Sequence, residues 1–94
     1  MVKKFGYEGE FTPRHGGKQY TFSFPNGFGA SVIQHQYSYG GDKGLWELAV
    51  LDSEGGLNYD TEITNDVIGY LTEDEVHETL NQIKKLLPET TVNA

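Results

Sequence analysis

The three histidines of the sequence are the first candidates for catalysis or metal binding. Histidine transfers protons near neutral pH and is the commonest metal ligand in proteins. His15 lies in a glycine-flanked loop, His35 in a predicted strand and His77 in a predicted helix. A metal site on one helix needs ligands four residues apart, yet the neighbours of His77 at that spacing are Glu73 and Asn81. One carboxylate and one imidazole match no common metal site, so we expect neither a metal ion nor a catalytic histidine.

Nucleophilic catalysis and phosphate binding would require motifs that the sequence lacks. No serine sits in the G-x-S-x-G motif of a nucleophile elbow, although a catalytic triad also assembles from residues far apart in a chain. Segment 40–44, Gly-Gly-Asp-Lys-Gly, has neither the spacing nor the Lys-Ser/Thr ending of a phosphate-binding loop. Four carboxylates lie between residues 52 and 62, but the glycines stand at the wrong positions for a calcium loop.

We therefore predict a protein that is not an enzyme and that needs no cofactor. The alternative enzyme is a small metal-dependent hydrolase built on His35, His77 and the acidic residues of segment 52–60. The absence of cysteine removes disulfides, thiolate zinc sites and a cysteine nucleophile from consideration.

The negative charge of the chain is confined to its second half. The 94 residues include 14 Asp and Glu against seven Lys and Arg, which gives a net charge of −7. Residues 1–43 hold five basic and three acidic residues, whereas residues 44–83 hold ten acidic residues and no Lys or Arg. A net charge of this sign argues against nucleic-acid binding driven by phosphate contacts. It favours a partner with a basic surface, because complementary charge accelerates the encounter of two proteins.

Acidic residues around the predicted helix start are the main candidates for partner contact. We expect a basic protein to be bound by Glu62, Asp66, Glu73, Asp74 and Glu78. Two alternatives use the same carboxylates. In the first they serve solubility and helix capping, since acids favour helix N-termini. In the second they imitate the phosphates of DNA and occupy a nucleic-acid groove.

A second candidate for contact is the segment from Tyr37 to Gly44. Its two tyrosines and three glycines resemble the composition of binding loops, in which tyrosine supplies contact area at a low entropy cost. We predict that Tyr37 and Tyr39 anchor a partner. The alternative is that both rings pack over the sheet edge beside Trp46.

Residues 18–37 carry the pattern of a β-hairpin. Tyr20, Phe22 and Phe24 alternate with polar residues, which is the period of a half-buried strand. The sequence Asn26-Gly27 then predicts a tight turn, because both residue types tolerate positive φ. Residues 28–37 return as the second strand.

Further strands and loops are predicted on either side of this hairpin. Lys3–Phe11 reads as a weaker strand, and segment 12–17 as a loop. Segment 38–44 is a second predicted loop. The almost continuously apolar Leu45–Leu51 is typical of a central strand covered on both faces. Leu57–Asp60 is expected to be a short strand that completes a second hairpin.

The last third of the chain predicts one amphipathic helix, Glu73–Leu87. Thr72 and Glu75 form a capping box, in which each side chain accepts a hydrogen bond from the backbone of the other. Pro88 stops the helix. The spacing of the apolar residues places one stripe on the buried face: Val76, Leu80, Ile83 and Leu87.

Together these elements predict one α+β domain over residues 1–94. Four to five antiparallel strands form a meander, and the C-terminal helix packs on one face of the sheet. Segment 65–70 is expected to form a single helical turn that ends at Gly69, and residues 89–94 a frayed tail. No apolar run approaches the roughly 20 residues of a membrane span. With no cysteine in the chain, we expect a cytoplasmic protein.

Four segments in the middle of the chain form a recognisable pattern. They are residues 24–32 (FPNGFGASV), 37–41 (YSYGG), 44–51 (GLWELAVL) and 59–72 (YDTEITNDVIGYLT). Over about half of the chain, these segments resemble a type of small protein from bacteriophages and prophages. The resemblance implies a phage origin within a bacterial host, and no activity, substrate or catalytic residue.

The predicted function combines the charge pattern with this resemblance. Small acidic phage proteins often bind and inhibit host machinery, defence nucleases among them, so the resemblance implies an accessory role. We therefore predict a non-enzymatic module that binds a basic protein partner, with neither a nucleic acid nor a membrane as its target. The alternative is a structural phage component that self-associates through an exposed strand edge.

Overall fold

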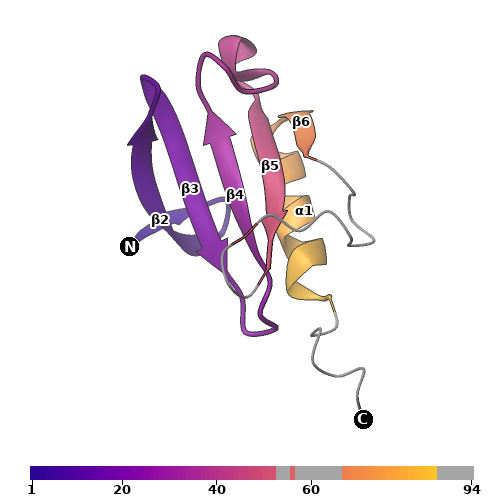
Figure 1. Cartoon of the computed structure of the whole chain (residues 1–94). Helices are drawn as coiled ribbons and strands as arrows, with labels where there is room; N and C mark the ends of the chain where they lie inside the picture. Colours follow the sequence, from indigo (N-terminus) through magenta and orange to yellow (C-terminus); the bar gives the residue numbers. More distant parts are fainter. Residues whose placement is uncertain (53–55, 57–66, 87–94) are drawn as a thin grey trace.

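The computed structural model contains six strands, one α-helix and one short 3₁₀ helix within the residues that it describes, 1–52, 56 and 67–86 (Figure 1). In chain order they are β1 (Val2–Lys4), β2 (Tyr7–Arg14), β3 (Gly17–Ser23), β4 (Gly29–Gln34), η1 (Gly41–Lys43), β5 (Trp46–Leu51), β6 (Ile68–Leu71) and α1 (Glu73–Lys84). The strands lie side by side in sequence order, and each pair is antiparallel. The predicted α+β meander with a C-terminal helix is confirmed, with six strands in the sheet.

The inner face of the sheet, which α1 covers, carries the main hydrophobic core. Phe22 of β3 lies opposite Ala30 of β4, and Val32 of β4 lies opposite Leu48 of β5. All four residues are at most 1% exposed. Because directly opposed residues of antiparallel strands share a face, these pairs form one apolar layer across three strands. The predicted hairpin is confirmed as β3 and β4, and the predicted central strand as β5. The second strand of the hairpin ends at Gln34, so His35 lies in the following loop and its predicted place in a strand is wrong.

Helix α1 begins at the predicted capping box. The Thr72 hydroxyl accepts a hydrogen bond from the Glu75 N–H at 3.2 Å, and the Glu75 carboxylate accepts one from the Thr72 N–H at 2.9 Å. Val76, Leu80 and Ile83 are fully buried against the sheet, as the stripe predicts.

The helix ends three residues earlier than the predicted Leu87, at Lys84. The side-chain nitrogen of Asn26, in the β3–β4 turn, lies within hydrogen-bond distance of the carbonyls of Ile83 and Lys84 at the end of the helix and of Leu86 just beyond it. The Ile83 carbonyl also accepts from the Leu86 N–H at 3.1 Å, so a tighter turn follows Lys84 and Asn26 caps carbonyls at the end of the helix. Residues 87–94, including Leu87 and the predicted tail, lie outside the described part of the chain.

The prediction of one strand over Lys3–Phe11 is wrong, because the chain reverses in its middle. Phe5 and Gly6 have φ angles of 55° and 84°, and they join β1 to β2 as a two-residue turn. Two consecutive positive φ angles are the signature of the tight hairpin turns that match strand twist. The reversal buries the Phe5 ring among three core rings, those of Tyr20, Phe22 and Trp46.

The predicted loop over residues 12–17 is also wrong. Strand β2 continues to Arg14, and His15 and Gly16 form the turn to β3 with φ angles of 49° and 76°. A two-residue turn of this kind needs a glycine at its second position far more than at its first. The sequence signal for this turn is Gly16, whose φ of 76° lies in the region that favours glycine.

A strand replaces the helical turn that was predicted over residues 65–70. Residues 65 and 66 lie outside the described part, but Ile68–Leu71 forms β6 and pairs with β5. Pairing with β6 supplies hydrogen-bond partners for the outer edge of β5, which a local helical turn could not do. The predicted strand over residues 57–60 lies outside the described residues.

Candidate functional site

Two exposed tyrosines stack where the β4–β5 loop meets β6, and Tyr39 and Tyr70 together are named the tyrosine corner. Tyr37 is also exposed and lies two residues before Tyr39 in the loop, with its ring 5.2 Å from that of His15 and 6.1 Å from that of His35. The exposed fractions of Tyr37, Tyr39 and Tyr70 are 72%, 58% and 57%. Large aromatic rings are often buried in a small domain, so rings this exposed make the tyrosine corner the candidate contact surface of the described residues. Tyr39 stacks on Tyr70 of the edge strand β6, and the Tyr37 ring contacts those of His15 and His35, so both rings keep partners within the fold as well as an exposed face.

The loop that carries Tyr37 and Tyr39 is held by its own hydrogen bonds. The buried Ser38 hydroxyl accepts from the His35 N–H and donates to the His35 carbonyl, both at 2.9 Å. The Gly40 carbonyl accepts from the N–H groups of Lys43 and Leu45, both at 3.0 Å. This network closes the loop onto η1 and fixes the backbone from which the two tyrosines project.

Tyr39 is tied to the sheet on both sides of its backbone. Its N–H donates to a Glu47 carboxylate oxygen at 2.8 Å, and its carbonyl accepts from the Tyr70 N–H at 3.3 Å. The rings of Tyr39 and Tyr70 stack with 6.5 Å between centroids and 27° between planes. The backbone bonds hold the two chain segments together, and each tyrosine is still more than half exposed.

Glycine at position 69 allows this close approach of the loop to β6. A Cβ atom at Gly69 would lie 2.5 Å from the Cβ of Tyr39, a distance that real side chains do not reach. Tyr70 itself has a φ of 60°, a region that bulky residues avoid at a cost of about 1–3 kcal/mol. Such strain persists where the surrounding structure fixes the residue, and here the Tyr39 carbonyl holds the Tyr70 N–H.

Tyr70 is the site residue that the sequence prediction missed. It lies two residues before the helix cap Thr72, so β6 leads directly from the tyrosine corner into the acidic first turn of α1. The one sequence signal for it was Gly69, which was interpreted as the end of a helical turn.

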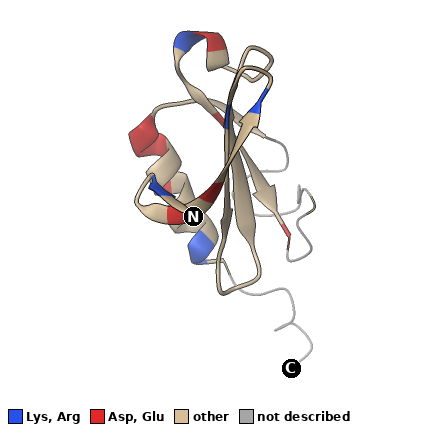
Figure 2. Cartoon of the chain, turned by 90° about the vertical axis from the view of Figure 1, so that its left-hand side faces the viewer, with Lys and Arg blue, Asp and Glu red and all other residues tan. Residues whose placement is uncertain are grey.

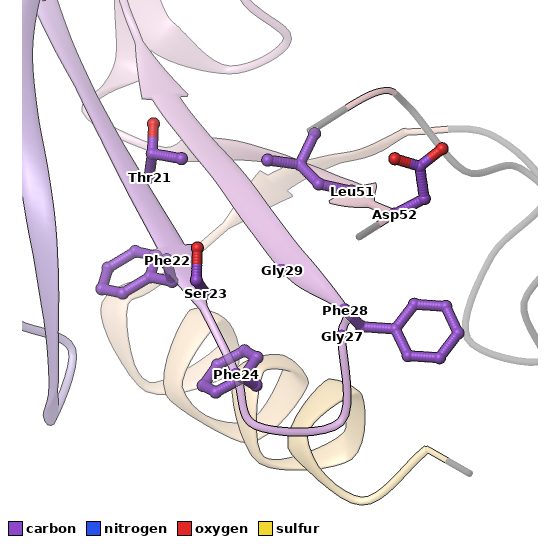
Figure 3. Close-up of a pocket in the computed structure, with 9 residues that line it drawn as sticks. All are labelled: Thr21, Phe22, Ser23, Phe24, Gly27, Phe28, Gly29, Leu51 and Asp52. Carbon is purple, nitrogen blue, oxygen red and sulfur yellow. The ribbon is translucent and has the colours of Figure 1, made fainter. Parts of the chain in front are cut away.

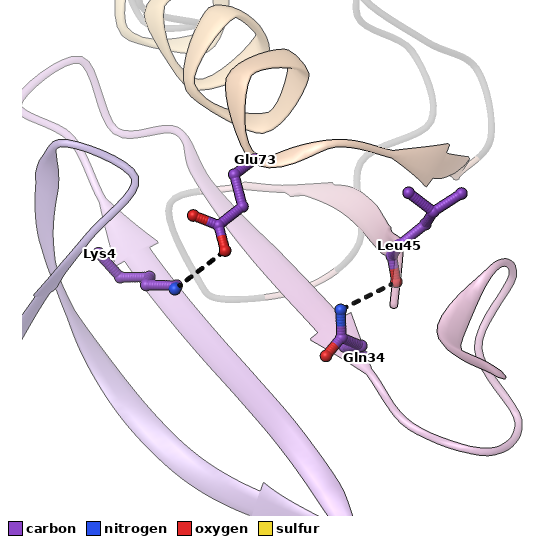
Figure 4. A network of polar contacts seen from close by, with 4 residues as sticks. All are labelled: Lys4, Gln34, Leu45 and Glu73. Carbon is purple, nitrogen blue, oxygen red and sulfur yellow. Dashed lines mark hydrogen bonds and ion pairs between the residues drawn. The ribbon is translucent and has the colours of Figure 1, made fainter. Parts of the chain in front are cut away.

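The predicted acidic contact residues divide into three groups. Asp74 and Glu78 are exposed on α1, one turn apart. Figure 2 shows the acidic residues of the chain in red, several of them on the helix. Glu73 is also exposed, and its carboxylate forms an ion pair with the Lys4 ammonium at 3.4 Å (Figure 4). Glu62 and Asp66 lie outside the described residues.

The histidines occupy two separate places. The rings of His15 and His35 meet edge to face at 5.0 Å, and Nδ1 of His35 accepts from the Tyr37 N–H at 3.1 Å. His77 lies elsewhere, with its Nδ1 at 2.7 Å from the carbonyl oxygen of Phe5. His15 follows β2 and Phe5 precedes it, so the two places adjoin opposite ends of an eight-residue strand. The hydrolase alternative needs His35 and His77 in one site, and this geometry gives it no support.

A small pocket lies at the end of the sheet opposite the tyrosine corner, and its volume is about 210 Å³ (Figure 3). Its polar groups include the hydroxyls of Thr21 and Ser23 and the carboxylate of Asp52. One Asp52 oxygen accepts from the Gly56 N–H at 2.9 Å. The volume is below the usual range of about 300–1,000 Å³ for ligand sites, and none of the predicted contact residues lines it.

Comparison with protein-family models, with curated proteins and with solved structures finds no match to the chain. Within the described residues, no helix has the length and apolar character to cross a membrane. In the same part of the chain, His, Asp and Glu side chains form no group of three or more that could hold a metal ion.

Proposed function

We propose that this protein is a non-enzymatic binding module that docks on a basic surface of another protein. The observation that carries the proposal is the junction between the tyrosine corner and the acidic start of α1. Tyr70 lies only three and four residues before Glu73 and Asp74, and it stacks against Tyr39. Aromatic anchors beside a charged rim are the usual composition of a protein interface.

The rigidity of the loop supports this proposal. Binding costs less when the contacting groups are already held in their bound arrangement. The hydrogen bonds of Ser38, Gly40 and Tyr39 hold the loop before any partner arrives. Glu62 and Asp66 extend the acidic surface in this proposal, as the sequence predicts.

The resemblance to small phage proteins gives the proposal its biological setting. In this setting the module acts in the cytoplasm of a bacterial host, and its partner is a component of host machinery with a basic surface. Inhibition of a host defence nuclease is one such role, because enzymes that act on nucleic acids present basic surfaces to their substrates.

Charge reversal on α1 tests the proposal directly. The variant D74K/E78K reverses two exposed carboxylates outside the capping box, and E8K/E10K reverses two exposed carboxylates on β2. Each reversal adds two charges, so both variants move the net charge from −7 to −3. Immobilised protein would be incubated with bacterial lysate at about 0.05 M and about 0.5 M salt, since salt screens exposed charges.

We expect the wild-type protein and E8K/E10K to capture the same partner at low salt and to lose it at high salt. We expect D74K/E78K to capture none of it, while its circular dichroism spectrum stays unchanged. Equal capture by the two variants would mean that the acidic start of α1 is not the contact surface.

A further inference from the structure

Tyr39 and Tyr70 form a stacked pair, named the platform, that is not part of the hydrophobic core. The two rings are nearly parallel, at 27°, and both residues are more than half exposed. Hydrophobic burial would favour covering these rings, and here their backbone is fixed while the rings stay accessible. A group that stacks on such rings gains contact without having to order them first.

Charges around the platform favour a cationic ligand. The Glu47 carboxylate is bonded to the Tyr39 N–H, and Glu73 and Asp74 follow Tyr70 in the chain. Aromatic faces attract cations through their negative quadrupole, and the neighbouring carboxylates add to that attraction. The nearby η1 carries one acidic and one basic residue, Asp42 and Lys43, so its charges cancel.

The protein already uses this chemistry within its own fold. The Lys4 ammonium lies 5.2, 5.9 and 5.7 Å from the ring centroids of Phe5, Tyr20 and Trp46. The same ammonium pairs with Glu73 at 3.4 Å (Figure 4). Thus a cation held between aromatic rings and a carboxylate is part of this structure, at the same helix start that adjoins the platform.

We propose that the platform binds an arginine side chain of the partner, whose guanidinium stacks on the Tyr39–Tyr70 pair and pairs with the exposed carboxylate of Asp74 at the start of α1. This inference rests on the proposed function, because it names the group through which the basic partner docks. Arginine fits better than lysine, since its planar guanidinium stacks on rings and bonds carboxylates in a bidentate manner.

Fluorescent poly-arginine and poly-lysine peptides of equal length are the probes for this site. We expect wild-type protein to bind the arginine peptide about three- to tenfold more tightly than the lysine peptide. Tyr39→Leu removes the aromatic face and should abolish this preference, whereas Tyr39→Phe should preserve it. The backbone bonds of Tyr39 survive both substitutions, so thermal unfolding should show both variants folded.

Two results overturn the inference. Equal affinity of wild-type protein for the two peptides, or an unchanged arginine preference in Tyr39→Leu, would show that no guanidinium stacks on the pair. If one of these results occurs and D74K/E78K still binds both peptides more weakly than the wild type, the proposed basic partner stands and only the arginine inference fails. If D74K/E78K binds both peptides as the wild type does, the proposed function fails too. Tighter binding of a single-stranded oligonucleotide than of either peptide would contradict both.

Discussion

Replacing Phe5 with alanine should lower the free energy of unfolding by about 3–5 kcal/mol, the usual cost of removing a buried phenylalanine ring. Phe5 is 9% exposed, and its ring centroid lies 4.9 Å from that of Trp46. The β1–β2 turn brings this ring over the inner face of the sheet, beside α1. Alanine would leave a cavity there and would also remove one of the rings beneath the Lys4 ammonium.

Phe11→Ala is the matched control, because Phe11 has the same side chain on β2 but is 45% exposed. Its loss should cost about 1 kcal/mol or less. Urea unfolding followed by tryptophan fluorescence measures both variants, with Trp46 as the reporter in the core. Equal destabilisation by the two substitutions would mean that the β1–β2 turn does not close the core.

Replacing Asn26 with aspartate should destabilise the protein by about 2–3 kcal/mol, more than replacing it with alanine. The Asn26 amide nitrogen lies 2.8 Å from the Ile83 carbonyl and 3.0 Å from the Leu86 carbonyl, so it caps the C-terminus of α1. Figure 3 shows the turn that carries it, at Gly27, against the helix. Aspartate has no N–H to donate, and its negative charge faces the negative end of the helix dipole.

The Asn26→Asp substitution distinguishes the helix-capping role of Asn26 from a role in the β3–β4 turn. The aspartate carboxylate still accepts from the Phe28 N–H, as the Asn26 side chain does at 3.0 Å, and Asp-Gly suits the same turn types. If position 26 served the turn alone, N26D would be as stable as the wild type in a thermal melt. Asn26→Ala should lie between the two, with a loss of about 1–2 kcal/mol.

Local patterns explain which parts of the fold were predicted from the sequence. The β3–β4 hairpin and α1 carry their signals within a few residues, as strict alternation, an Asn-Gly turn and a capping box. Strand β6 was not predicted because it depends on a long-range contact. It pairs with β5, whose Leu48 lies 20 positions before Ile68. The turn at Phe5 was missed because a phenylalanine with positive φ is disfavoured by local sterics, and core burial outweighs them.

The candidate site divides in the same way. Composition pointed to Tyr37, Tyr39 and the acids of α1, since residue types and charge are properties of the sequence itself. Tyr70 could not be found this way, because it belongs to the site through Tyr39, which lies 31 positions earlier. The exposure of these rings is likewise a result of the fold, as Tyr20 carries the same side chain and packs against Phe5 and Trp46.

The most direct test of the proposed docking surface is to map where a basic ligand binds on the protein. Adding the poly-arginine peptide to ¹⁵N-labelled protein and following the backbone amide signals by NMR would map the contact. We predict that the largest shifts fall on Tyr39, Tyr70 and Asp74, at the tyrosine corner and the start of α1. Shifts concentrated instead on Glu8 and Glu10 of β2, with the tyrosine corner unchanged, would contradict the proposal.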